Sequence, residues 1–215
     1  MNKICYIVGA STAAGMYIER RDGDFIIAAD AGLDALQKAG ITPDLAVGDF
    51  DSLGHIPDSG KVIRHPCEKD DTDTALSLAE GMKRGYRTFV IYGGLGGRLD
   101  HTMANLQNCA GAADHGAVCW IWGEGNAVCT FGDGNSLSFE KEKQGNVSVF
   151  AADRAVGVTI EGLKYELSDV CLTSTVPLGV SNEFTGRESR ISVADGTLIV
   201  MWSEDAESFV RRVRQ

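Results

Sequence analysis

Proline is scarce in this sequence: the 215 residues contain 4 prolines but 26 glycines. Few prolines beside many glycines exclude a collagen-like or linker-rich chain and indicate tight turns and close backbone approaches in a folded protein. A C-x-x-C pair is missing among the 6 cysteines, and the 4 histidines are scattered, which argues against a structural zinc site. Because 44% of the residues are hydrophobic and 23% are charged, we expect a buried core rather than disorder.

Long hydrophobic runs are missing as well. No segment is apolar over enough residues to span a membrane, and the run at residues 4–8 is too short for a signal-peptide core. We therefore expect a cytoplasmic protein with no membrane partner. The formal net charge of −10 at pH 7 repels nucleic acids, so no nucleic-acid partner is expected. The same charge would repel ATP, so a nucleotide site would need a metal ion or a local basic group.

The first part of the chain alternates short apolar runs with helical patterns. Buried strands are predicted at residues 4–8, 25–29, 45–47, 61–63, 88–92 and 118–122. Helices are predicted at residues 33–39, from about Thr74 to Lys83, and from about Asp100 to Ala113. Apolar strands alternating with helices are typical of a parallel sheet covered on both faces. We therefore predict an α/β fold with a Rossmann-like, parallel-sheet domain over residues 1–124.

The pattern changes after about Gly125. Apolar runs become short and alternating, with glycine, asparagine and aspartate at the turns, as at residues 127–131, 146–150 and 196–202. No convincing long amphipathic helix appears in this part. These features predict a second, all-β domain over residues 125–215, built as a sandwich or a barrel.

Acidic residues stand where the predicted strands end. Asp30 follows the second strand, and Asp49 and Asp51 follow the third, in Gly48-Asp49-Phe50-Asp51-Ser52. Ligands of open parallel sheets bind outside the carboxyl ends of the strands. A D-x-D pair aims both carboxylates at one hard cation, and Mg²⁺ prefers oxygen ligands. We therefore predict a magnesium site formed by Asp49 and Asp51 and completed by Asp73 or Asp100.

These carboxylates also have simpler explanations. The cluster at residues 70–73 precedes a predicted helix, where carboxylates cap free N–H groups. Asp49 and Asp51 lie beside glycine and serine, which favour turns. Turn chemistry alone does not explain acidic clusters at successive strand ends.

A glycine-rich stretch, Gly93 to Gly97, follows the strand predicted at residues 88–92. Such a loop lets backbone N–H groups approach an anion, although this one lacks the G-K-[ST] of a P-loop. Arg98, directly after it, offers donors suited to phosphate, and Lys69 is a second possible phosphate contact. Each cation read in isolation is equally compatible with a solvated surface position.

Taken together, these motifs resemble the signatures of thiamine pyrophosphokinases. The matching stretches are Asp30-Ala31-Gly32, Gly48-Asp49-Phe50-Asp51-Ser52, Lys69-Asp70-Asp71-Thr72-Asp73, Gly93-Gly94-Leu95-Gly96-Gly97-Arg98-Leu99-Asp100-His101, Gly162 to Leu167 and Val180-Ser181-Asn182-Glu183-Phe184. They occur in the family's order. The sequence departs from the family's D-G-G at Ala31, and at Glu68-Lys69-Asp70 it replaces the D-Q-D of some members, which leaves the role of Glu68 open.

The resemblance implies an enzyme that transfers diphosphate from ATP to the hydroxyl of thiamine with Mg²⁺ and releases AMP. It implies a homodimer with the site between subunits, where the β domain supplies Ser181, Asn182 and Phe184 to thiamine. An aromatic face against a flat cation is physically sensible; without the resemblance, Phe184 would be taken as a core or rim aromatic. The implied nucleotide-binding residues are Asp30, Gly32, Lys69, Asp70, Gly94, Gly96, Gly97 and Arg98.

The predicted roles follow from phosphoryl-transfer chemistry, which depends on positioning and charge neutralisation. Asp49, Asp51 and Asp73 would hold Mg²⁺, and Arg98 would stabilise charge on the transferred group. Asp100 would orient the start of its helix, and it or Asp73 would accept the hydroxyl proton.

Other functions remain open at this stage. A Mg²⁺-dependent phosphatase would need D-x-D-G-T after the first strand, and this motif is absent. A glycosyltransferase with a D-x-D site lacks support in the second half of the chain. A thiamine- or nucleotide-binding sensor without catalysis is expected to lack carboxylates that are present here.

Overall fold

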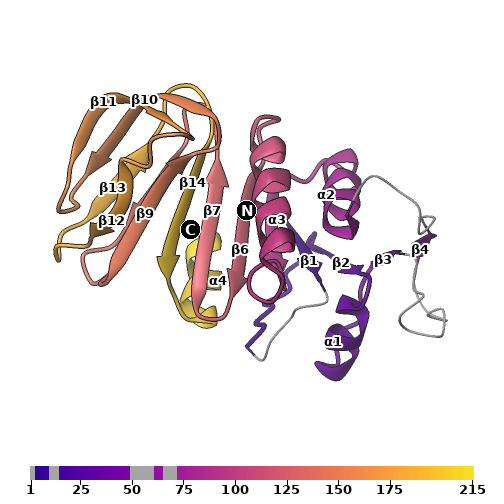
Figure 1. Cartoon of the computed structure of the whole chain (residues 1–215). Helices are drawn as coiled ribbons and strands as arrows, with labels where there is room; N and C mark the ends of the chain where they lie inside the picture. The colour runs from indigo at the N-terminus through magenta and orange to yellow at the C-terminus, as the bar shows by residue number, and fades with distance from the viewer. Residues whose placement is uncertain (1–2, 10–14, 49–60, 65–71) are drawn as a thin grey trace. The chain divides into compact units, whose positions relative to one another are not determined.

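The structure is a computed structural model that describes residues 3–9, 15–48, 61–64 and 72–215. The chain divides into two compact units. The first consists of Met1–Asn108, Trp120–Glu124 and Ala206–Gln215, and the second of Cys109–Cys119 and Gly125–Asp205. Hydrogen bonding defines a large mixed sheet of 10 strands and a separate antiparallel sheet of 4 strands (Figure 1). Each unit is described by itself below.

Parallel strands form the centre of the first unit. They are β1 (Ile4–Val8), β2 (Phe25–Ala29), β3 (Leu45–Gly48), β4 (Lys61–Arg64) and β5 (Thr88–Tyr92). The next strand along the chain is β6 (Val118–Gly123), which lies beside β5. The strands of this part of the sheet lie in the order β6-β5-β1-β2-β3-β4. β1 pairs in parallel with both β2 and β5, and β3 pairs in parallel with β2 and β4. The predicted parallel arrangement is confirmed. All five residues of β1 are buried, as expected for a strand covered on both faces.

Helices cover the parallel strands. In Figure 1, α1 (Gly32–Lys38) lies on one side of β1 and β2, and α2 (Asp73–Lys83) lies on the other. Gly81 lets α2 approach the sheet closely, because a Cβ at this position would lie 2.5 Å from the Phe89 ring. α3 (Leu99–Ala113) follows the glycine-rich stretch. The three predicted helices are confirmed, each with its start shifted by about one residue.

The second unit is mainly antiparallel. One set of strands runs in the order β12-β9-β14-β7, with bounds Gly179–Glu183, Asn146–Ala151, Leu198–Ser203 and Asn126–Phe131. The other runs β11-β10-β13-β8, with bounds Leu167–Thr173, Arg154–Glu161, Ser189–Ser192 and Ser136–Phe139. In β9, Val147, Val149 and Ala151 are buried while the residues between them are more exposed. This period of two confirms the alternating strands predicted here.

A C-terminal helix, α4 (Ala206–Val213), was not predicted. Its buried residues are Phe209, Val210 and Val213, which form a short apolar stripe among charged neighbours. Phe209 packs edge to face against Tyr92 and Trp120, so α4 belongs to the first unit. The second unit resumes at Gly125, as the sequence suggested, but the division into domains 1–124 and 125–215 stays a prediction.

A buried ion pair fastens the C-terminus to the first unit. Arg214 Nη2 lies 2.5 Å from Asp24 Oδ2, with side chains 9% and 1% exposed. Asp24 also accepts hydrogen bonds from the backbone N–H groups of Ile4 at 2.9 Å and Arg21 at 2.8 Å. Burial alone would raise the pKa of Asp24, but the hydrogen bonds from Arg214 and these N–H groups lower it. Arg214 also donates to the Tyr6 hydroxyl at 2.8 Å, and burial raises the pKa of Tyr6 to about 12.

Candidate functional site

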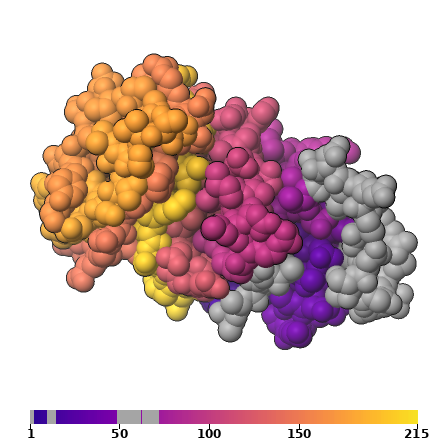
Figure 2. All heavy atoms as spheres, in the orientation of Figure 1, coloured from indigo at the N-terminus to yellow at the C-terminus, as the bar shows by residue number. Residues whose placement is uncertain are grey.

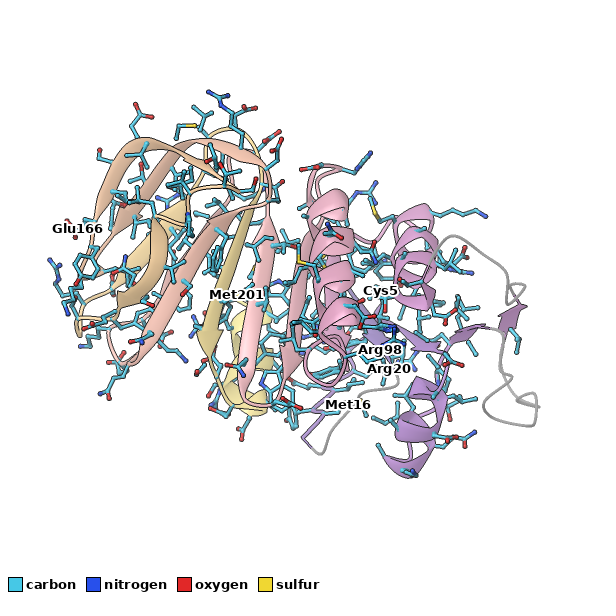
Figure 3. All side chains as sticks on the ribbon, in the orientation of Figure 1. Cys5, Met16, Arg20, Arg98, Glu166 and Met201 are labelled. Atoms are coloured by element: carbon cyan, nitrogen blue, oxygen red, sulfur yellow. The ribbon has the colours of Figure 1, made fainter. Side chains whose placement is uncertain are left out.

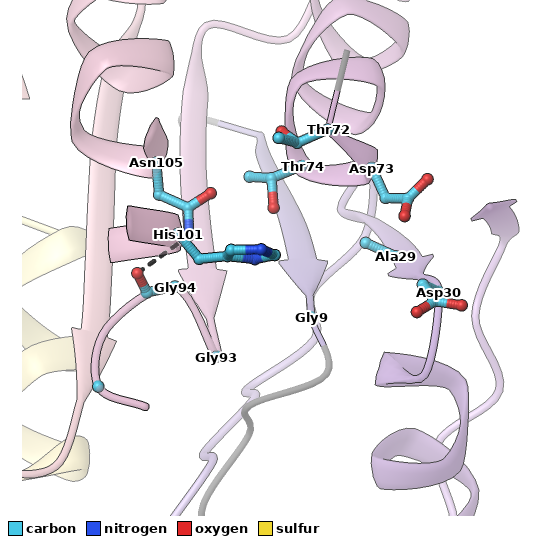
Figure 4. Close-up of a pocket in the computed structure, with 11 residues that line it drawn as sticks. Gly9, Ala29, Asp30, Thr72, Asp73, Thr74, Gly93, Gly94, His101 and Asn105 are labelled. Atoms are coloured by element: carbon cyan, nitrogen blue, oxygen red, sulfur yellow. Dashed lines mark hydrogen bonds between the residues drawn. The ribbon is translucent and has the colours of Figure 1, made fainter. Parts of the chain in front are cut away.

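A pocket of about 190 Å³ lies at the carboxyl ends of the parallel strands (Figure 4). Gly9 follows β1, Asp30 follows β2, and Gly93 follows β5, so three neighbouring strand ends contribute to it. The remaining lining residues are Ala29, Thr72, Asp73, Thr74, Gly94, Gly96, His101 and Asn105. Strand ends of this kind form the ligand-binding edge of open α/β sheets, so the pocket is where the sequence predicted a site.

Asp30 adopts a left-handed backbone conformation, with φ of 47°. Its N–H donates to the Val47 carbonyl at 2.8 Å, and its carbonyl accepts from Leu33 N–H at 3.2 Å. The turn therefore joins β2, β3 and α1 at one residue. Non-glycine residues with this conformation concentrate at functional positions, and aspartate tolerates it better than most.

Gly32 begins α1 and is buried against β1. A Cβ at this position would lie 1.8 Å from the Val8 carbonyl oxygen. Gly32 does not line the pocket, and its role in the structure is close packing against β1. The nucleotide-binding role of Gly32 stays a prediction.

Replacing Gly32 with alanine is expected to destabilise the protein by at least about 3 kcal/mol, because the backbone at Gly32 or at Val8 would have to move. Gly111 is a matched control, because no atom lies within 4 Å of a Cβ built there in α3. The Gly111→Ala variant is expected to keep or gain stability, by about 0.5–1 kcal/mol. Urea unfolding of both variants measures the difference, and equal free energies of unfolding would contradict the close approach.

The start of α2 supplies Thr72, Asp73 and Thr74 to the pocket. Thr72 caps the helix, because its Oγ1 accepts from Ala75 N–H at 3.2 Å. Ser77, fully buried, donates to the Asp73 carbonyl at 2.7 Å and fixes the first turn. The sequence allowed the acidic cluster at residues 70–73 to cap this helix, but in the structure the capping side chain at the start of α2 is that of Thr72. The carboxylate of Asp73 lines the pocket instead.

The glycine-rich stretch reaches the pocket through Gly93, Gly94 and Gly96, whereas Gly97 is exposed and does not line it. Gly94 is confined by packing, since a Cβ there would lie 2.8 Å from Ile121 Cγ2. A Cβ on Gly96 would lie 2.6 Å from the Glu124 carboxylate. A larger residue at Gly94 would therefore push against β6, whereas at Gly96 it would meet the end of the flexible Glu124 side chain.

Arg98 and Asp100 bind each other rather than the pocket. Arg98, which is labelled in Figure 3, donates through Nη2 to Asp100 Oδ2 at 2.6 Å and through Nε to Asp100 Oδ1 at 3.1 Å. The two side chains are 70% and 64% exposed. The hydrogen bonds from Arg98 lower the pKa of Asp100. Neither residue lines the pocket, so their catalytic roles stay predictions.

Part of the predicted site lies outside the described residues, namely Asp49, Asp51, Glu68, Lys69 and Asp70. Of the three predicted magnesium ligands, the structure describes Asp73 alone. Within residues 3–9, 15–48, 61–64 and 72–215, no group of three or more histidine, cysteine, aspartate or glutamate side chains is arranged to hold a metal ion.

Several lining residues were not predicted as site residues, namely Gly9, Ala29, Thr72, Thr74, Gly93, His101 and Asn105. Thr72, Gly93 and His101 lie inside motifs that the sequence analysis names. Asn105 stood four residues after His101, which places both on one face of α3. That spacing was the available signal for it.

The predicted thiamine-binding residues lie in the second unit. Asn182 is buried, and its Oδ1 accepts from Tyr165 N–H at 3.0 Å and Glu183 N–H at 2.9 Å, while Nδ2 donates to the Tyr165 carbonyl at 2.7 Å. These bonds fasten the turn at Tyr165 to β12. The amide oxygen thus already accepts two hydrogen bonds, and a substrate contact for Asn182 stays a prediction.

Ser181 and Phe184 flank this position. Ser181 is exposed with φ of 57°, and its N–H donates to Ser148 Oγ at 3.1 Å. Phe184 is half-buried and packs edge to face on Phe139, with ring centroids 4.9 Å apart. This packing agrees with the rim position that the sequence also allowed for Phe184. Contact with thiamine stays a prediction for both Ser181 and Phe184.

The described pocket defines a class: an α/β protein with a small polar site at the ends of parallel strands. A family model described as "Thiamin pyrophosphokinase, catalytic domain" matches residues 20–121, and one described as "Thiamin pyrophosphokinase, vitamin B1 binding domain" matches residues 135–198. The two matches follow one another along most of the sequence. The chain belongs to the thiamin pyrophosphokinase family.

Individual relatives agree with this family. A thiamine pyrophosphokinase from Bacillus subtilis (strain 168) is 28% identical over 186 residues, which covers 83% of this chain and 87% of the relative. A crystal structure of the Bacillus subtilis thiamine pyrophosphokinase has a TM-score of 0.80 at 25% identity, covering 94% of this chain and 100% of that one. A thiamin pyrophosphokinase from Geobacillus thermodenitrificans has a TM-score of 0.77 at 25% identity, with coverages of 94% and 98%.

Among the described residues, no helix combines the length and the hydropathy needed to cross a bilayer.

Proposed function

We propose that this chain transfers the diphosphate group of ATP to the hydroxyl of thiamine and releases AMP. The observation that carries the proposal is the match of one chain to both family models, a catalytic domain and a vitamin B1 binding domain. The pocket at the strand ends supports it, because all its lining residues except Gly9 lie within the span of the catalytic match and they include glycines, hydroxyls and carboxylates. The phosphatase, glycosyltransferase and sensor alternatives gain no support from these comparisons.

The finer architecture belongs to this proposal. We take the parallel strands of the first unit as a Rossmann-like catalytic domain and the antiparallel strands of the second as a sandwich that binds thiamine. The site would lie between the subunits of a cytoplasmic homodimer. Support comes from the parallel pairing of β1 with both β2 and β5, and from the antiparallel pairing of strands in the second unit.

The residues of the pocket suit a magnesium ion bound with phosphates. Asp73 supplies a hard oxygen ligand, the donor type that Mg²⁺ prefers, and Asp49 and Asp51 would add the others. When bound, the ion would neutralise charge on the phosphate oxygens.

The protein's own groups would position the phosphates and handle the proton. The first turn of α2 lines the pocket, and helix N-termini favour anions. Asp73 is better suited than Asp100 to accept the hydroxyl proton. Asp73 lines the pocket, whereas Asp100 lies outside it, and the hydrogen bonds from Arg98 lower the pKa of Asp100.

The test is incubation of the purified protein with thiamine, ATP and Mg²⁺, followed by chromatography of nucleotides and thiamine esters. We expect AMP and thiamine diphosphate in equal amounts, and neither when thiamine or Mg²⁺ is left out. Formation of ADP or free phosphate without thiamine diphosphate would reject the proposal in favour of a phosphatase. Binding of thiamine without turnover would favour a sensor.

A further inference from the structure

Asn105 joins the glycine-rich loop to the pocket. It lies on α3, 7% exposed, and its side chain lines the pocket. Its Nδ2 donates to the Gly94 carbonyl at 3.0 Å, the contact drawn as a dashed line in Figure 4. Gly94 also packs closely beside β6, because a Cβ there would lie 2.8 Å from Ile121 Cγ2. The hydrogen bond from Asn105 and the packing against Ile121 thus both fix this part of the loop.

The other end of the same amide is unused. Among the described residues, no donor reaches Asn105 Oδ1, although buried carboxamide oxygens ordinarily accept a hydrogen bond. The oxygen is not one of the fully enclosed unpaired atoms of the described structure, which are Ser189 Oγ and Arg214 Nε. In Figure 4 it points away from Gly94, toward the side of the pocket where Thr74 lies. A nearly buried acceptor therefore faces the space that a ligand would occupy.

The chemistry of this acceptor restricts its partner. Phosphate oxygens at neutral pH only accept hydrogen bonds, so Oδ1 does not suit a phosphate. A base is also a poor fit, because Ala29 is the sole apolar side chain and the His101 imidazole the sole aromatic ring among the described lining residues. The amino groups of adenine and of the thiamine pyrimidine are carried on flat aromatic rings, which this lining suits poorly for the same reason. A hydroxyl group is the remaining donor that both proposed substrates carry.

We infer that Asn105 is a positioning and specificity-determining residue. Its Nδ2 holds the glycine-rich loop, and its Oδ1 accepts a hydrogen bond from a hydroxyl group of a bound substrate. The inference rests on the proposed function for the identity of the substrates. The hydroxyl belongs either to the ribose of the nucleotide or to the alcohol of thiamine, and a neutral amide would orient it without removing its proton.

The test combines one side-chain change with removal of one hydroxyl. Calorimetry would measure the binding of AMP, its 2′-deoxy and 3′-deoxy forms, thiamine, and the thiamine analogue in which hydrogen replaces the hydroxyl. In the wild type, loss of the recognised hydroxyl is expected to weaken binding about tenfold. In the Asn105→Ala variant the same loss is expected to have almost no effect, because its acceptor is gone. Coupling with a ribose hydroxyl assigns the nucleotide, and coupling with the alcohol assigns thiamine.

The loop-holding role is tested by Asn105→Asp, which keeps an acceptor and the shape but removes the donor to Gly94. We expect this variant to raise the KM for ATP several-fold, while discrimination between the hydroxyl and deoxy ligands persists. Asn135→Ala is the matched control, since Asn135 Nδ2 donates to the Gly132 carbonyl at 2.8 Å and lies outside the pocket. This control is expected to leave binding and activity unchanged.

Two results would overturn the inference. Equal hydroxyl discrimination in the wild type and Asn105→Ala, for every ligand pair, would leave Asn105 with a structural role only. An unchanged KM for ATP in Asn105→Asp would remove the loop-holding role. A wild-type protein that bound neither thiamine nor adenine nucleotides would instead reject the proposed function together with the inference. Because binding is measured without turnover, the two failures are distinguishable.

Discussion

Replacement of Asp73 with asparagine is expected to lower turnover by about 10²–10⁴-fold with little loss of stability. Asp73 lines the pocket at the first turn of α2 and is the described member of the predicted magnesium set. Asparagine keeps its size but removes the negative charge and the basicity. The helix itself should persist, because Thr72 supplies the cap. Steady-state rates of AMP release across a range of Mg²⁺ concentrations would measure the effect.

Asp34 offers the matched control for this variant. It also lies in the first turn of a helix, α1, but does not line the pocket. Asp34→Asn is therefore expected to retain wild-type turnover. If Asp73→Asn and Asp51→Ala both kept normal turnover with normal Mg²⁺ dependence, the metal and base assignments would be wrong.

Replacement of Asp24 with alanine is expected to destabilise the protein by about 3–5 kcal/mol, because it leaves the buried charge of Arg214 unpaired. It also leaves the N–H groups of Ile4 and Arg21 without their acceptor. For a chain of this length the loss corresponds to a decrease in Tm of roughly 10 °C. Differential scanning calorimetry would measure it.

An exposed pair on α4 provides the comparison. Arg211 Nη1 lies 3.2 Å from Glu207 Oε1, and the two side chains are 64% and 65% exposed. Exposed pairs contribute about 0–1 kcal/mol, so Glu207→Ala should hardly change Tm. Equal decreases in Tm for Asp24→Ala and Glu207→Ala would refute the special role of the buried pair.

The stability contributed by Asp24 also depends on pH in a defined direction. Its pKa in the folded protein is lowered, so the unfolded chain binds the proton more tightly. The contribution is therefore complete above the unfolded pKa of about 3.9 and is lost as the pH falls through the folded value. The difference in unfolding free energy between the wild type and Asp24→Ala should shrink below about pH 4.

Most of the parallel strands were predictable because their sequences are continuous apolar runs. The run at β1 is buried at every position, as an uninterrupted apolar sequence indicates. The short helix α4 was not predictable in the same way, because its stripe of Phe209, Val210 and Val213 gains meaning only where it packs beside Tyr92 and Trp120. Helices of this length depend on tertiary contacts more than on propensity.

The site was predictable to the level of strand ends and motifs but not to the level of partners. Asp30 and Asp73 line the pocket as the sequence placed them, because parallel strands bring their carboxyl ends to one edge. The pairing of Arg98 with Asp100 depends on side-chain geometry that spacing does not fix. The bond from Asn105 to Gly94 joins a helix to a loop 11 residues earlier, and only the folded chain brings them together.

The exposed face of α3 shows the same limit. Leu99 is 82% exposed and Met103 is 54% exposed, although both occupy helix positions that apolar periodicity would place toward a core. Figure 2 shows that part of α3 lies at the visible surface. The pattern predicted the helix correctly, but which apolar side chains are covered follows from the elements packed around it. Sequence periodicity thus located the helix more reliably than its buried face.

The most direct test of the central claim follows two isotopic labels in ATP during a single incubation with thiamine and Mg²⁺. Diphosphate transfer predicts that label from the γ-phosphate appears in thiamine diphosphate, while label from the α-phosphate stays in AMP, in equal molar amounts. Label from the γ-phosphate in free phosphate or in thiamine monophosphate, with ADP as the nucleotide product, would contradict the account.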